Sequence, residues 1–186
     1  MAHSPRRHAA RLSLVFFFSG FASLLYQVAW QRALTLHYGV ASVSIVLIVS
    51  IYMLGLGAGS LLGGWLAERL RRPAIGFLVA QALIGVFGFI SVPLLDFLGA
   101  RTAGAQRLAA AFYTLLFLCA PTVLMGVTLP LITKVYSRLH DFASAISLLY
   151  FVNTLGAAAG ALVASYVVIS LLGMDAAVYV AATINL

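Results

Sequence analysis

Long apolar runs, separated by short segments that hold most of the charged residues, are the feature that most constrains this sequence of 186 residues. Several runs exceed the roughly 18 residues that a helix needs to cross the hydrocarbon core of a bilayer. We therefore expect an all-α fold, a polytopic membrane helix bundle of six transmembrane helices with the sixth truncated. The expected spans are about 12–36, 40–67, 74–95, 108–133, 142–172 and 174–186.

Composition indicates the same class of protein. Hydrophobic residues make up 63% of the chain and charged residues only 8%, whereas soluble domains have about a quarter of their residues charged. The net charge of +7 does not indicate nucleic-acid binding, because the arginines lie at the ends of the apolar runs rather than on one face. The expected partner is a lipid bilayer. The histidines show no metal-ligand spacing, so no metal site is expected.

The amino-terminal segment, residues 1–11, holds Arg6, Arg7 and Arg11 directly before the first apolar run. A secretory signal begins in the same way, but this run continues to about Leu36, longer than a signal needs. We therefore expect an uncleaved first span and a cytoplasmic segment before it. With this orientation the inner segments hold eight Lys and Arg residues and the outer segments three, as the positive-inside rule requires. The expected location is the bacterial cytoplasmic (inner) membrane.

The last apolar run, residues 174–186, is too short to span a bilayer. Its 13 residues would form a helix of about 20 Å, against a hydrocarbon core of about 30 Å. We expect the chain to be part of a longer protein.

Two glycine stripes predict close helix packing. Gly55, Gly59 and Gly63 lie at i, i+4 and i+8, where bare backbone lets a neighbouring helix approach. Gly156 and Gly160 repeat the first two at a constant offset of 101 residues (156 − 55 and 160 − 59). Three spans separate the copies, which is typical of the three-plus-three inverted repeat of secondary transporters. A nucleotide-binding glycine loop is the alternative, but no soluble βαβ unit surrounds these residues.

Four segments, in order, resemble the membrane-embedded spermidine synthase-like proteins, in which a major facilitator-like membrane region is fused to an aminopropyltransferase domain. They are SGFASLLYQVAWQR at 19–32, GLGAGSLLGGWLAERLRRP at 55–73, APTVLMGVTLPLI at 120–132 and LYFVNTLGAAAGALVA at 149–164. The resemblance implies a downstream soluble domain with polyamine aminopropyltransferase activity, which takes decarboxylated S-adenosylmethionine as aminopropyl donor. No catalytic or cofactor-binding residue is expected within these 186 residues.

The charged turn after the first glycine stripe resembles the loop between helices two and three of major facilitators, Gly-x-Leu-Ala-Asp-Arg-x-Gly-Arg. Glu68 stands at the Asp of that pattern and Arg69 at its Arg, while Arg71 replaces the second glycine. Glu68, Arg69, Arg71 and Arg72 could form a cytoplasmic charge network that locks helix bundles together. The alternative is a solvated anchor on anionic lipid, worth about 1 kcal/mol per basic residue.

Polar residues inside the spans are the candidates for substrate contact. Gln27 and Gln31 lie at i, i+4 beside Tyr26 and Trp30, and amide oxygens with aromatic faces can hold a cationic amine. Interhelical hydrogen bonds with an aromatic belt at the outer interface are the alternative. Asn153 in the fifth span is a further candidate. The four acidic residues all lie in loops or at span ends, which argues against a carboxylate proton relay here.

Three functions remain open from the sequence. The first is the membrane region of a spermidine synthase-like fusion protein, which anchors the downstream enzyme and moves a polyamine or a related small molecule. The second is half of a major facilitator-type transporter without enzyme activity. The third is a membrane scaffold.

Overall fold

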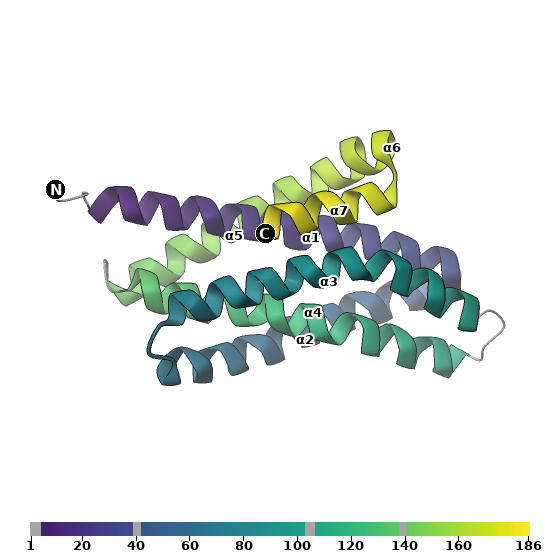
Figure 1. The fold of residues 1–186 in the computed structure, drawn as a ribbon, viewed down its shortest axis with the longest axis horizontal. Helices are drawn as coiled ribbons and strands as arrows, with labels where there is room; N and C mark the ends of the chain where they lie inside the picture. The colour runs from purple at the N-terminus through teal and green to yellow at the C-terminus, as the bar shows by residue number, and fades with distance from the viewer. Residues whose placement is uncertain (1–4, 39–41, 103–106, 138–140) are drawn as a thin grey trace.

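A computed structural model describes residues 5–38, 42–102, 107–137 and 141–186, and nearly all of them are helical (Figure 1). The elements are α1 (Pro5–Tyr38), α2 (Ser42–Arg69), α3 (Pro73–Thr102), α4 (Arg107–Tyr136), α5 (Phe142–Val163), the π-helical η1 (Ala164–Val168), α6 (Ile169–Leu172) and α7 (Met174–Asn185). No strand occurs within the described ranges. The expected all-α membrane bundle is confirmed.

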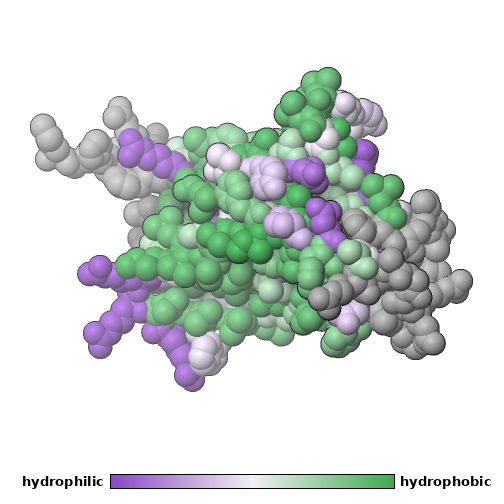
Figure 2. Space-filling view, turned by 45° about the vertical axis from the view of Figure 1, so that its right-hand side comes forward, coloured by the Kyte–Doolittle hydropathy of each residue, from purple (hydrophilic) through white to green (hydrophobic). Residues whose placement is uncertain are grey.

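Within the described residues, five helical segments are long and apolar enough to cross a membrane. They are Ala10–Leu36, Ile48–Arg69, Pro73–Ala100, Phe112–Tyr136 and Ala143–Leu172. The last of them runs through α5, η1 and α6 without a break, and Gly173, at φ 87°, then turns the chain into α7. Figure 2 shows a broad hydrophobic middle on the visible face and a cluster of hydrophilic side chains at one end.

Helix α3 extends beyond its expected end. The sequence suggested an exit from the span at Pro93 and Asp96, but the helix continues to Thr102. A proline inside a helix removes one backbone hydrogen bond without necessarily ending the helix. Leu95 is buried in the main core cluster, so packing after Pro93 holds the chain on the bundle.

The helices pair as an inverted repeat requires. The most extensive interfaces join α2 to α4 and α1 to α5, followed by α3 with α4 and α1 with α7 (Figure 1). If α1, α2 and α3 correspond to α4, α5 and α7, then the α2–α4 interface is equivalent to the α5–α1 interface. In the same way, the α3–α4 interface is equivalent to the α7–α1 interface. The pairing therefore supports the three-plus-three repeat that the two glycine stripes indicated.

Glycines lie at both of the major interfaces. A Cβ on Gly55 would meet the side chain of Thr122, and one on Gly59 would lie 2.9 Å from Gly126 Cα. A Cβ on Gly63 would lie 2.8 Å from Val127 Cα. In the equivalent interface, Gly156 and Gly160 of α5 face the backbone of Phe17 and Phe21 of α1. Backbones that approach this closely gain van der Waals contact, the main source of helix association in lipid.

Candidate functional site

A buried aromatic cluster joins α1, α3 and α4. Trp30 is 0% exposed and stacks on Tyr26 with 4.7 Å between ring centroids. Phe87 and Phe117 meet the Trp30 ring at 90° and 82°, with centroid distances of 5.7 and 5.6 Å. The aromatic faces are therefore occupied by one another.

A hydrogen bond anchors the cluster to α3. The Trp30 indole Nε1 donates to Ser91 Oγ at 3.0 Å, and Ser91 Oγ donates to the Gly88 carbonyl at 2.8 Å. The interhelical hydrogen bonding that stood as the alternative to an amine site is therefore present, because α3 satisfies the Trp30 N–H inside the bundle. Trp30 is not exposed as a ring of the accompanying aromatic belt, since its side chain is 0% exposed. A belt residue would keep that group at the headgroup level.

The four polar candidates on α1 and α5 occupy different surroundings. Tyr26 is fully buried, and its hydroxyl donates a long hydrogen bond of 3.5 Å to the Ile84 carbonyl. Gln27 is 9% exposed and Gln31 half-buried. Asn153 lies against Gly20, about two helical turns along α1 from Gln27. The structure does not bring Asn153 to the glutamines.

A second buried tyrosine, Tyr52 of α2, contacts α1 and α4. Its contact on α1 lies on the face that also carries Gln27 and Gln31, here called the glutamine stripe. The Tyr52 hydroxyl lies 3.0 Å from the Ser23 carbonyl of α1 and 3.2 Å from Met125 Sδ of α4. Ser23 precedes Gln27 by one helical turn on the same stripe of α1. Gln27 thus lies one helical turn, and Gln31 two turns, along α1 from the point where α1, α2 and α4 meet. Nothing in the sequence pattern singled out Tyr52, because one tyrosine in an apolar run carries no information on its neighbours.

The basic turn between α2 and α3 is solvent-exposed. Glu68, Arg69, Arg71 and Arg72 are all exposed, and within the described part of the chain no ion pair joins the carboxylate to these arginines. The Arg69 guanidinium instead lies 4.2 Å from the ring centroid of Trp65, one helical turn before it. This cation–π contact orients Arg69 along α2. The charge network with other parts of a longer protein stays a prediction.

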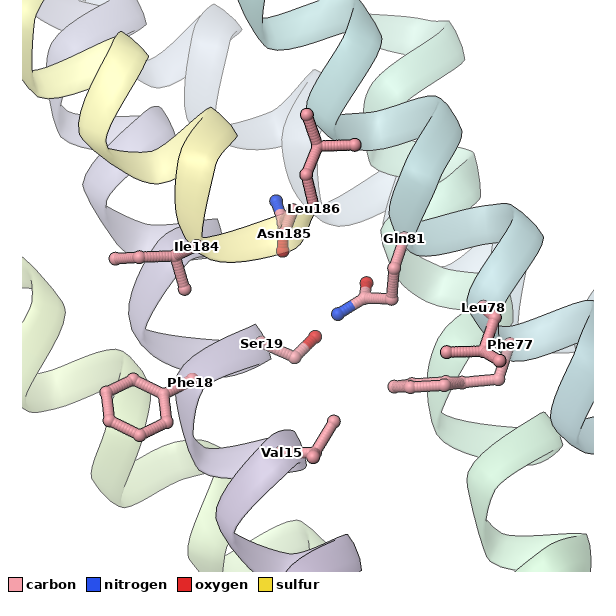
Figure 3. A pocket seen from close by; sticks show the side chains of 9 residues that line it. All are labelled: Val15, Phe18, Ser19, Phe77, Leu78, Gln81, Ile184, Asn185 and Leu186. Carbon is pink, nitrogen blue, oxygen red and sulfur yellow. The ribbon is translucent and has the colours of Figure 1, made fainter.

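The pocket shown in Figure 3 lies between α1, α3 and the end of α7. Its volume is about 420 Å³, and most of its lining is apolar. Three buried polar side chains from the three helices converge on it, namely Ser19, Gln81 and Asn185. The sequence showed each as an isolated polar residue in a different apolar run. Spacing alone does not reveal that they meet.

Comparison with known proteins gives one result. The family model of the Major Facilitator Superfamily matches residues 12–186. No curated protein and no solved structure shows a significant match. The family match covers nearly the whole chain, and the helix pairing agrees with it. The chain belongs to the Major Facilitator Superfamily.

Proposed function

We propose that this member of the Major Facilitator Superfamily forms a six-helix unit of a membrane carrier for a small molecule. The observation that carries the proposal is the family match over residues 12–186, together with the two equivalent glycine-lined interfaces. An inverted repeat lets one three-helix unit rock against the other around a site between them, which is how secondary transporters alternate access. A scaffold has no need of such symmetry.

The more specific proposal is that the carried molecule is a polyamine, and that the unit anchors a downstream aminopropyltransferase using decarboxylated S-adenosylmethionine. Its support is the resemblance of four segments to spermidine synthase-like fusion proteins. The competing proposal is a transporter without an enzyme. The residues encoded after Leu186 discriminate the two, since a glycine-rich βαβ segment supports the fusion and six further apolar runs support the transporter.

The glutamine stripe of α1 is the proposed contact for an amine. Glu68, Asp96, Asp141 and Asp175 are exposed, so the described helices offer an amine no buried carboxylate. Gln27 and Gln31 supply neutral oxygen acceptors instead, one and two helical turns along α1 from the meeting point of α1, α2 and α4. The Trp30 ring is not available for a cation–π contact, because aromatic neighbours cover it.

The proposed orientation places the amino terminus in the cytoplasm. Exposed basic side chains gather at the end of the bundle where α2 passes into α3. They are Arg11, Arg69, Arg71, Arg72 and Lys134. The opposite end presents exposed Arg32, Asp96 and Asp175. This asymmetry fits a basic end in contact with the anionic cytoplasmic leaflet.

Gln27→Leu and Gln31→Leu are expected to lower spermidine uptake into proteoliposomes about tenfold, because each removes a hydrogen bond to a charged amine worth about 1.5–3 kcal/mol. Uptake of radiolabelled spermidine by protein expressed from its complete reading frame measures the effect. Gln81→Leu, the same change on α3, is the matched control and should leave uptake unchanged. Wild-type uptake with no loss in either variant would remove the glutamine site, whereas no wild-type uptake would remove the polyamine proposal.

A further inference from the structure

The hydroxyl of Tyr52 lies between two acceptors that belong to different helices. It is 3.0 Å from the Ser23 carbonyl of α1 and 3.2 Å from Met125 Sδ of α4. A phenol has one proton, and a thioether sulfur is a weaker acceptor than a carbonyl oxygen. The Tyr52 side chain is 1% exposed, so water does not compete for this proton. The proton therefore goes to Ser23, and Met125 Sδ is the weaker, alternative acceptor.

The carbonyl that receives this bond belongs to the turn of α1 that leads to Gln27. In a regular helix the Ser23 carbonyl also accepts the backbone N–H of Gln27, four residues on. The Ser23 hydroxyl donates to the Ser19 carbonyl at 2.9 Å, so it does not compete for the Tyr52 proton. Helix α1 packs extensively on α5 but only sparsely on α2 and α4. The Tyr52 bond thus fixes the Gln27 turn at a place where helix packing by itself holds it weakly.

The weaker acceptor belongs to the other half of the inverted repeat. Helices α1 and α2 lie in the first three-helix unit, whereas α4, which carries Met125, begins the second. Met125 lies in the stretch of α4 between Pro121 and Pro130. Each proline removes one backbone hydrogen bond, so this stretch can bend more easily than a regular helix. A Met side chain is flexible and adapts to a shifted neighbour. The Tyr52–Met125 contact can therefore open while the bond to Ser23 stays.

We propose that Tyr52 is a positioning residue of the amine site, which holds the Gln27 turn of α1 on α2 as the second unit moves. The inference rests on the proposed function of the glutamine stripe. Tyr52 acts through Gln27 and does not touch the amine. Tyr52→Phe removes only the hydroxyl and keeps the ring, and the Ser23 carbonyl keeps its bond from the Gln27 N–H. The variant should therefore fold, but with Gln27 held less firmly in place.

Uptake kinetics test the positioning role. Protein expressed from its complete reading frame is reconstituted into proteoliposomes, and uptake of radiolabelled spermidine is measured over a range of concentrations. We expect Tyr52→Phe to raise KM about fivefold, the equivalent of one neutral hydrogen bond, and to change the maximal rate by less than about twofold. A merely structural defect would lower the maximal rate through loss of folded protein and leave KM unchanged. Met125→Leu, which conserves volume but removes the sulfur acceptor, is the matched control and should leave KM unchanged.

A double variant tests whether Tyr52 acts through Gln27. Gln27→Leu removes the amide that the Tyr52 bond positions, so Tyr52→Phe should add no further increase in KM to it. If the two increases in KM multiplied instead, Tyr52 would affect uptake by another route. An unchanged KM in Tyr52→Phe, or an equal rise in Met125→Leu, would likewise overturn the positioning role.

Hydrogen–deuterium exchange of the same protein in nanodiscs tests the anchoring without transport. Tyr52→Phe should raise the exchange rate of the α1 peptide that contains Ser23 and Gln27 about fivefold, in proportion to the lost hydrogen bond, whereas Met125→Leu should not. Unchanged exchange in Tyr52→Phe would overturn the inference whether or not spermidine is carried. Faster exchange in a protein that carries no spermidine would refute the polyamine proposal, and the positioning role with it. The two failures are therefore distinguishable.

Discussion

Gly59→Leu should separate α2 from α4 and lower the midpoint of thermal unfolding by about 6–12 °C. A Cβ at this position would lie 2.9 Å from Gly126 Cα and closer still to the Val123 carbonyl. Both obstacles are backbone atoms of α4, which cannot turn aside as a side chain can. Overpacking of this kind costs about 3 kcal/mol, and 1 kcal/mol shifts the midpoint by about 2–4 °C in a chain of this size.

Gly57→Leu is the matched control for that substitution. Gly57 lies two residues away on the same helix, and a Cβ there would have nothing within 4 Å. Both substitutions gain the same helix propensity, so any difference between them reports packing against α4. Unfolding of the detergent-purified proteins, followed by intrinsic fluorescence, measures the difference. Equal midpoints for the two variants would contradict the α2–α4 interface.

Trp30→Ala should destabilise the bundle by about 3 kcal/mol. Alanine leaves a cavity among Tyr26, Phe87 and Phe117 and removes the hydrogen bond to Ser91. In soluble cores the substitution of Trp by Ala costs about 3–5 kcal/mol. The lower end of that range applies here, because lipid replaces water around the unfolded helices and weakens the transfer term. Unfolding in a graded sodium dodecyl sulfate titration measures the loss.

Two further variants separate the contributions of Trp30. Trp30→Phe keeps an aromatic ring but cannot donate to Ser91, so it should fall between wild type and Trp30→Ala. Trp65→Ala removes the second of the two tryptophans, a half-exposed side chain on α2, and should change stability by less than about 1 kcal/mol. A larger loss in Trp65→Ala than in Trp30→Ala would place the aromatic core elsewhere.

The fold class followed from the sequence because lipid imposes a length on every span. Apolar runs of sufficient length must be helices, and bare glycines at helical spacing must face another helix. The identity of the partner helix is a different matter. The stripe from Gly55 to Gly63 does not predict whether α4 or α3 packs against it, since all the spans are similarly apolar. The partner helix is identified as α4 only by the close approach of the stripe to Gly126 and Val127 in the structure.

The site was less predictable, for a physical reason. Trp30 lies two residues before Arg32, which is typical of an aromatic belt at the interface, yet its N–H donates to Ser91 on α3, sixty-one residues away. Ser19, Gln81 and Asn185 likewise converge from separate helices. In a soluble helix the apolar face would show which side is buried, but in these helices both sides are apolar. Polar convergence is therefore visible only in three dimensions.

Cysteine accessibility tests most directly the central claim, a bundle threaded through the membrane with its basic end inside. In a background of Cys119→Ala, Arg71→Cys marks the turn between α2 and α3, and Asp175→Cys marks the opposite end near Gly173 (Figure 1). A membrane-impermeant maleimide should label Asp175→Cys in intact cells and Arg71→Cys only after permeabilisation. Labelling of Arg71→Cys in intact cells, or identical behaviour of the two positions, would contradict the account.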